Sequence, residues 1–272
     1  MREAQSNDEW IFPMSIRTAA VSGMQADESW LSGISQNVAN ATTTGFKTTT
    51  TNFETLVDQV GQRGLGVSSR SFVTAGSQGS IASGSLPTNL AIQGNGFFVV
   101  SDASGNTYLT RDGSFSPDAS GNLVNASGYT LMGASVNGGA NLAMVNVAQP
   151  GSGGSSVEDV AVSSTGVLSF TYSNGATIPA YSLRLANVAS PNNLTAVNGT
   201  AFLPNANSGQ VQTGPAGTGG LGTVSTSSLE GSTTNLTMAL ESLIQAQNSY
   251  QFNSQAFQTG DKIISDLNNI SE

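Results

Sequence analysis

Apolar residues recur every seven positions along the last part of this 272-residue chain. A heptad repeat of this length is typical of a coiled-coil helix, because the stripe stays on one side and needs a partner to bury it. The sequence therefore predicts a C-terminal helix paired with another helix, with N-cap candidates at 232–235. A helix packed against its own domain is the alternative. The stripe consists of Leu229, Leu236, Leu243, Tyr250, Phe257 and Ile264, joined by Leu240 and Leu267, with Gln247, Ser254 and Asp261 as a second row.

The N-terminal part of the chain carries a shorter stripe at helical spacing. Asp27 falls on this stripe and interrupts it, and Gly45 suits the end of a helix because glycine adopts the left-handed conformation. We expect this helix to be the partner of the C-terminal one. Residues 1–13 lack a basic segment followed by an apolar one, so we interpret them as a leader or alternative start rather than a cleaved signal peptide. The stripe comprises Ile16, Ala20, Met24, Leu31, Ile34, Val38 and Ala41.

The middle of the chain has the pattern of short strands separated by turns. Residues 86–133 alternate apolar runs with turn residues and predict a β-meander, and a second β block runs from about 160 to 202. The turn Asp-Ala-Ser-Gly-Asn occurs at 102–106 and again at 118–122, and Asp and Gly there favour hairpin turns. The expected fold class is mainly β with terminal α-helices, a discontinuous β domain flanked by coiled-coil-like helices.

Composition excludes several classes of function. The net charge is −9 and only eight residues are basic, so the chain offers no patch for nucleic acid. Cysteine and histidine are absent, which removes disulfides, thiolate nucleophiles, histidine bases and Cys/His metal sites. The carboxylates form no obvious catalytic pair in an apolar setting. We expect neither an enzyme nor a cofactor, and no segment is apolar for the roughly 20 residues that span a membrane.

Four stretches together resemble the family of bacterial flagellar rod and hook proteins. The clearest is the motif at 37–47, NVANATTTGFK, and the others are LAIQGNGFF at 90–98, TRDGSF at 110–115, and SLEGS at 228–232 followed by IQAQNSY at 244–250. Asn248 stands where the family usually has arginine. The matches cover nearly all of 14–133 and 160–270. Within the family, residues 180–193 and the stretch GPAGTGGLGTV at 214–224 are more similar to hook than to rod sequences. The first motif marks Asn37, Asn40, Thr43, Gly45, Phe46 and Lys47 as assembly residues.

The resemblance implies a domain plan. Residues 14–60 and 227–272 would be paired terminal helices lining an inner tube, and 61–133 with 160–226 the β domain. Only a short Gly/Ser-rich segment, 134–159, stands where hook proteins usually carry an outer domain.

The resemblance also implies a function. The chain would be a structural subunit that polymerises into the hook, a tubular universal joint between rod and filament. Its partners would be further copies of itself, the distal rod, the hook cap, the hook–filament junction proteins and the flagellar type III export apparatus. It would lie outside the cell after export. A rod subunit of the same family is the alternative, since the short 134–159 segment is closer to rod proteins in length, and a secreted β-rich adhesin is a second alternative.

Overall fold

The structure, a computed structural model, describes residues 8–57, 64–136, 141–147, 155–163 and 166–271. The chain forms two compact units. The first, called the helical unit below, comprises Met1–Ala39, Thr49–Phe72 and Asn235–Glu272. The second, the β unit, comprises Asn40–Thr48 and Val73–Thr234. The expected fold class, mainly β with terminal helices, is confirmed.

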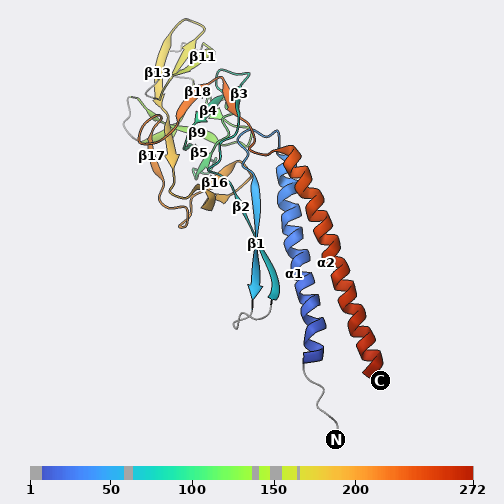
Figure 1. Ribbon diagram of the computed structural model, residues 1–272. Coiled ribbons are helices and arrows are strands. Elements are labelled where there is room, and N and C mark those ends of the chain that lie inside the picture. Colours follow the sequence, from blue (N-terminus) through green and yellow to red (C-terminus); the bar gives the residue numbers. More distant parts are fainter. Residues whose placement is uncertain (1–7, 58–63, 137–140, 148–154, 164–165, 272) are drawn as a thin grey trace. The chain divides into compact units, whose positions relative to one another are not determined.

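The helical unit contains two long helices that lie side by side (Figure 1). Helix α1 (Asp8–Ala39) has 32 residues and α2 (Leu236–Ser271) has 36. They are antiparallel, since Arg17 near the start of α1 meets Asp261 near the end of α2, whereas Asp27 meets Asn253. Helix α1 begins at Asp8, so residues 8–13 are helical. Residues 1–7 lie outside the described residues, and the interpretation of 1–13 as a leader or alternative start stays a prediction.

A two-stranded hairpin, β1 (Thr49–Val57) and β2 (Gly64–Val73), completes the helical unit. We expected helices alone at 14–60, and the Thr-rich run at 49–57 is a strand because β-branched residues fit the extended backbone. The hairpin packs on α1: the rings of Trp30 and Phe53 meet edge to face with centroids 5.4 Å apart. The Val67 N–H also donates to Ser22 Oγ at 3.1 Å. Helix α1 thus packs on two sides.

The β unit is built from short strands. Its largest sheet follows the order β11-β12-β13-β9-β5-β6-β16-β15, with β10, β14, β17, β7 and β8 attached beside this path. The strands are β3 (Ile81–Ser83), β4 (Leu90–Gln93), β5 (Phe97–Ser101), β6 (Thr107–Thr110), β7 (Ser116–Pro117), β8 (Leu123–Val124), β9 (Thr130–Ser135), β10 (Leu142–Met144), β11 (Val157–Val162), β12 (Val167–Tyr172), β13 (Thr177–Ser182), β14 (Arg184–Asn187), β15 (Thr195–Ala196), β16 (Ala201–Leu203), β17 (Gln212–Pro215), β18 (Thr223–Thr226) and β19 (Ser228–Glu230), with a 3₁₀ turn at Pro191–Asn193.

The meander predicted over 86–133 forms only in part. Strand β5 lies between β6 and β9, but β4 leaves this group and pairs with β18 from the far end of the unit. Gly94 and Gly96, with φ of 105° and 120°, let the chain turn out of the sheet between β4 and β5. Strand β3 pairs in the same way with β19. The two strands that precede α2 are therefore paired with the strands near the start of the β unit.

The two Asp-Ala-Ser-Gly-Asn turns have the same hydrogen bonds. Asp102 Oδ1 accepts from the N–H groups of Ser104 and Asn106, and Asp118 Oδ1 accepts in the same way two and four residues on. The Asn106 side chain and backbone hold the pKa of Asp102 below its usual value. Backbone and side-chain bonds from Asn122 lower the pKa of Asp118 likewise. The carboxylates thus organise the turns by accepting backbone N–H groups.

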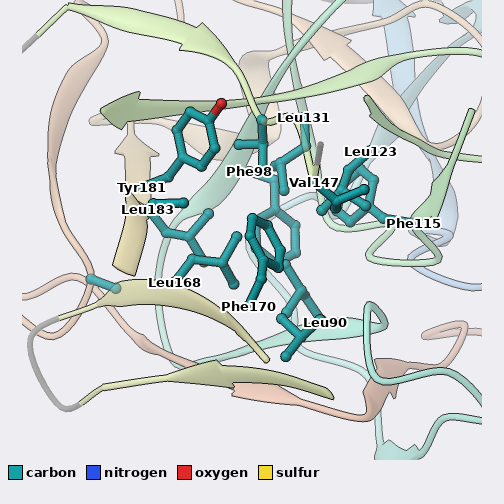
Figure 2. Packing of buried hydrophobic residues seen from close by; sticks show 14 of the residues in the cluster. Leu90, Phe98, Phe115, Leu123, Leu131, Val147, Leu168, Phe170, Tyr181 and Leu183 are labelled. Carbon is teal, nitrogen blue, oxygen red and sulfur yellow. The ribbon is translucent and has the colours of Figure 1, made fainter. Parts of the chain in front are cut away.

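The larger of two apolar clusters in the described part of the β unit is drawn from both β blocks (Figure 2). Rings from the first block meet there, since Phe98 and Phe115 lie edge to face at 5.7 Å. The second block adds Phe170 and Tyr172, both fully buried, and the Tyr172 hydroxyl donates to the Val147 carbonyl at 2.6 Å. Because both clusters contain residues from the two blocks, the blocks belong to a single discontinuous unit. Figure 2 labels Leu90, Phe98, Phe115, Leu123, Leu131, Val147, Leu168, Phe170, Tyr181 and Leu183.

Candidate functional site

The segment that follows α1 and the segment that precedes α2 are joined inside the β unit. The Gly45 N–H donates to the Glu230 carbonyl at 2.8 Å, and the Thr233 N–H donates to the Phe46 carbonyl at 3.1 Å. The Thr48 N–H donates to Thr233 Oγ1 at 2.9 Å. We call residues 40–48 and 228–234 the chain-end junction. It includes most of the motif at 37–47.

Gly45 is at this position because no other residue fits. Its φ of 67° lies in the left-handed region, and an added Cβ would stand 2.4 Å from the Asp112 backbone nitrogen. An alanine would therefore meet both backbone strain and a backbone clash. The predicted left-handed conformation of Gly45 is confirmed. The prediction that Gly45 ends the N-terminal helix is wrong, because α1 already ends at Ala39 and Ala41 lies outside it. The structure adds the close approach to the chain at 111–112.

A buried cluster of three charged side chains lies at the junction. Lys47 Nζ donates to Glu230 Oε1 and, at 2.6 Å, to the Ser77 carbonyl. Arg111 Nη1 donates to Glu230 Oε2 at 3.1 Å, and its Nη2 donates to the Gly94 carbonyl at 2.8 Å. The Gly79 N–H also donates to Glu230 Oε1 at 2.8 Å. Lys47 and Glu230 are fully buried and Arg111 is 2% exposed.

One carboxylate thus serves two cations away from water. Burial lowers the pKa of Lys47 and of Arg111, and attraction to Glu230 offsets part of each shift. The Arg111 guanidinium also lies over the Phe97 ring, 5.2 Å from its centroid. An unpaired buried charge is very costly, so Glu230 holds both cations in place. It thereby connects the segment before α2 with the segment after α1 and with the Arg111 segment of the β unit.

A second buried carboxylate, Asp112, supports the same segment. Its Oδ1 accepts from Thr44 Oγ1 at 2.9 Å and from Ser114 Oγ at 2.6 Å. Its Oδ2 accepts from Asn125 Nδ2 at 3.2 Å. Next to it, Gly113 approaches the Leu90 carbonyl so closely that a Cβ would stand 1.6 Å from that oxygen. The Arg-Asp-Gly run at 111–113 therefore packs against the chain-end junction and supports it.

The remaining motif residues take separate structural positions. In the helical unit, Asn37 is buried and forms two 2.8 Å bonds with the backbone of Thr49, the first residue of β1. In the β unit, Thr43 Oγ1 donates to Asn40 Oδ1 at 3.1 Å. Phe46 is buried, with its ring 3.5 Å from the Cβ position of Gly199. These positions give the motif a structural reason, while its role in assembly remains a prediction.

The predicted helix stripe needs correction on α2. Leu229 is not helical but lies in β19 of the β unit, because the helix starts only at Leu236. Leu236, Leu240 and Tyr250 are exposed at 48%, 45% and 41%. The other predicted positions are half-buried, apart from Ile34, which is buried: Met24, Leu31, Val38, Leu243, Phe257, Ile264 and Leu267.

A different row of α2 packs most closely on α1. Ala239, Ala246 and Gly260 are buried, and Asn253 completes the same seven-residue spacing. An added Cβ at Gly260 would lie 3.0 Å from Arg17 Cγ, which shows how closely the helices approach there. The helices thus meet through small residues, and many large apolar side chains of α2 face outward. Sequence reasoning followed the larger side chains and placed the row one residue too late, at Gln247, Ser254 and Asp261.

Arg111 and Glu230 were not predicted as site residues. Both lie in stretches that carry the family resemblance, so the available signal was the presence of charged residues inside these motifs in a chain with only 9% charged residues. No group of three or more His, Cys, Asp or Glu residues that could hold a metal occurs in the part of the chain that the structure describes. Neither described helix is long and apolar enough to cross a membrane.

Comparisons with known proteins identify the class. Residues 91–170 match the family model "Flagellar hook protein FlgE/F/G D1 domain", and residues 225–270 match "Flagellar basal body rod FlgEFG protein C-terminal". The two matched regions include Arg111 and Glu230 of the buried charge cluster. The chain is therefore one of the structural proteins of the flagellar hook and rod.

Relatives over the full length identify the family within this class. The flagellar hook protein FlgE of Brucella suis is 30% identical, with 92% of this chain and 97% of that protein covered. The hook protein FlgE of Rhizobium meliloti is 27% identical with the same coverage. The basal-body rod protein FlgG of Bacillus subtilis is 29% identical, with 93% and 97% covered. This chain belongs to the flagellar hook protein FlgE family.

The two kinds of relative differ in length. The alignment with the Brucella suis hook protein spans 385 positions, so at least 113 of them have no counterpart in a chain of 272 residues. The alignment with the Bacillus subtilis rod protein spans only 269 positions. This chain thus aligns with the hook proteins over 92% of its residues, while its 272 residues are close in number to the 269 positions of the rod-protein alignment.

Proposed function

We propose that this hook subunit polymerises through its helical unit into the tubular universal joint between rod and filament. The observation that carries the proposal is the outward apolar surface of α2, since Met238, Ile244 and Phe252 are exposed at 65%, 60% and 70%. A helix with so much exposed apolar surface is stabilised when neighbours cover it. Contacts between unlike surfaces that do not close into a ring produce a helical polymer.

The domain plan follows from the same proposal. The paired terminal helices would line the inner tube, with the β unit outside them. The segment 134–159 would occupy the place of the outer domain, and the positions of the Brucella suis hook protein that lack a counterpart here support a missing domain. The chain-end junction would connect the two layers in each subunit.

The partners and location also belong to the proposal. The chain would be exported without a cleaved signal peptide by the flagellar type III apparatus. Outside the cell it would contact further copies of itself, the distal rod, the hook cap and the hook–filament junction proteins. Its role would be mechanical rather than enzymatic.

A rod subunit is the second candidate, favoured by the length of this chain and by its match to rod protein FlgG over 93% of its residues. Electron microscopy of a deletion strain separates the two. We expect basal bodies with a complete rod and no hook. Basal bodies that stop before the distal rod would refute the hook assignment in favour of the rod.

The polymerisation step is tested in the same strain. Complementation with Ile244→Ser/Phe252→Ser should leave the strain without hooks, because both outward side chains lose their apolar contacts. Val136→Ser, at a residue of the β unit that is 44% exposed, is the matched control and should restore hooks. Normal hooks with the double variant would contradict the role of this surface.

A further inference from the structure

The pairing of α1 with α2 is ambiguous in its apolar pattern. The row of α1 that is most deeply buried is Ala20, Asp27 and Ile34, at 3%, 3% and 4% exposure, and these residues are seven apart. The row of α2, 239–246–253–260, is also spaced by seven. Since both rows repeat with the same period, sliding one helix by seven residues keeps small and apolar residues in contact. The apolar pattern alone therefore specifies no single register.

The face of α2 that meets α1 is ambiguous as well. Large apolar side chains lie on both flanks of the small-residue row, with Leu240 and Ile244 on one flank and Phe252 and Ile263 on the other. Turning α2 about its axis would bring leucine or phenylalanine against α1 in place of alanine. On hydrophobic burial alone, such a turn would be favourable. Something other than apolar contact must select the small-residue face.

Each of these repetitive rows contains one polar member, and the two meet. Asn253 Nδ2 donates to Asp27 Oδ2 at 2.7 Å. The contact is shaped by Gly23, because a Cβ there would lie 2.7 Å from the Asn253 amide. Asn253 therefore occupies a recess that only glycine leaves open. The Arg17–Asp261 ion pair lies in the same register, but both side chains are more than 40% exposed, which makes the pair worth about 0–1 kcal/mol.

We propose that the Asp27–Asn253 pair determines the register and the face with which α1 and α2 pair in one subunit. In any shifted or rotated arrangement, Asp27 would be a buried carboxylate without its amide partner, which is strongly unfavourable. A polar pair in an apolar seam lowers the stability of the correct pairing less than that of its competitors. The pair thus keeps the large apolar side chains of α2 outward. The pairing concerns a single chain, while the use of the outward surface rests on the proposed function.

Spin-label distances within the full-length chain test this proposal. Ser32→Cys and Lys262→Cys place labels on exposed positions of α1 and α2, and the chain has no other cysteine. A slip of one heptad moves the labels along the helix axis by about 10 Å. We expect one narrow distance distribution in the otherwise unchanged chain. A broad distribution there would overturn the proposal, because the pair would then not hold the helices.

Two substitutions are compared on this background. Asp27→Ala/Asn253→Ala removes the polar member of each row, so that both rows contain only small or apolar residues. This variant should show additional distances between the two labels while keeping its helix content by circular dichroism. Asp27→Asn/Asn253→Asp keeps a carboxylate–amide pair and should give the unchanged single distance. If helix content falls in the alanine variant, Asp27→Leu/Asn253→Leu, which fills the space, replaces it with the same expectation.

The opposite results overturn the proposal. A single unchanged distance in the alanine or leucine variant would mean that the chain connections at either end of the helices set the register. Multiple distances in the exchanged variant would mean that the carboxylate–amide contact is not the determinant. Neither result depends on whether the chain polymerises, which is measured separately by sedimentation and by hook formation.

Discussion

Replacing Glu230 by glutamine should lower the free energy of unfolding of the β unit far more than a substitution at an exposed residue. The side chain keeps its shape but loses the charge that serves Lys47 and Arg111, both of which are essentially inaccessible to water. Removing one member of a buried ion pair typically costs about 3–5 kcal/mol. A domain is usually stable by about 5–15 kcal/mol, so the loss is a large fraction of the total.

The assay is urea and thermal unfolding of the purified full-length chain, both followed by near-ultraviolet circular dichroism of the buried aromatic rings. For a unit of this size, a loss of 3–5 kcal/mol corresponds to a fall in Tm of about 6–20 °C. Glu158→Gln is the matched control, because Glu158 is exposed in β11, and it should change stability by less than about 0.5 kcal/mol.

A second variant separates charge from packing. Lys47→Met removes one cation and leaves the Arg111–Glu230 pair, so its charge cluster is neutral. In Glu230→Gln, by contrast, the cluster keeps two positive charges and no carboxylate. Lys47→Met should therefore cost at least about 2 kcal/mol less than Glu230→Gln. Equal losses in the two variants, or a loss below about 1 kcal/mol for Glu230→Gln, would refute the reasoning that an unpaired buried cation dominates.

Three further predictions concern the β unit. Gly45→Ala should destabilise by more than about 2 kcal/mol in urea unfolding, whereas Gly128→Ala, with a φ of 82° and no atom within 4 Å of the added Cβ, should cost about 1 kcal/mol; equal costs would contradict the clash. The pKa values of Asp102 and Asp118 are lowered in the folded chain, so their contribution to the free energy of unfolding is complete above about pH 4 and is lost as the pH falls through the folded pKa values. Unfolding midpoints measured from about pH 7 to about pH 2 should therefore fall less steeply in the Asp102→Asn/Asp118→Asn variant. An unchanged slope would contradict this. Phe170→Ala, in the core, should cost about 3–5 kcal/mol in the same assay, and a loss under about 1 kcal/mol would show that the site is not packed as described.

Local patterns in the sequence predicted the local elements well. The stripes at both ends predicted two helices, and the repeated Asp-Ala-Ser-Gly-Asn turns have the bonds that such turns form. These features depend on neighbours within a few positions in the chain. The resemblance to flagellar hook and rod proteins, carried by four short motifs, is confirmed by the family models and by full-length relatives.

Features that depend on distant partners were predicted less well. The hairpin β1–β2 was missed because β1 is mostly exposed. An exposed strand does not need the alternation of apolar and polar residues by which strands are predicted. Strand β4 was expected to pair with its neighbour in sequence, but its partner β18 lies more than 100 residues later. Periodicity identifies a strand and does not identify the strand beside it.

The sequence by itself determined that α2 is amphipathic with a period of seven. It also placed Gly45 and Lys47 in the motif at 37–47 that resembles the family. Only the tertiary structure decided which row of α2 is buried, because Gly23 and Asp27 on α1 accept small or polar side chains and not leucine. Likewise, it brought Lys47, Arg111 and Glu230 together from three separate segments. A heptad has several faces and a charge has many possible partners, and the choice among them is made where distant parts of the chain meet.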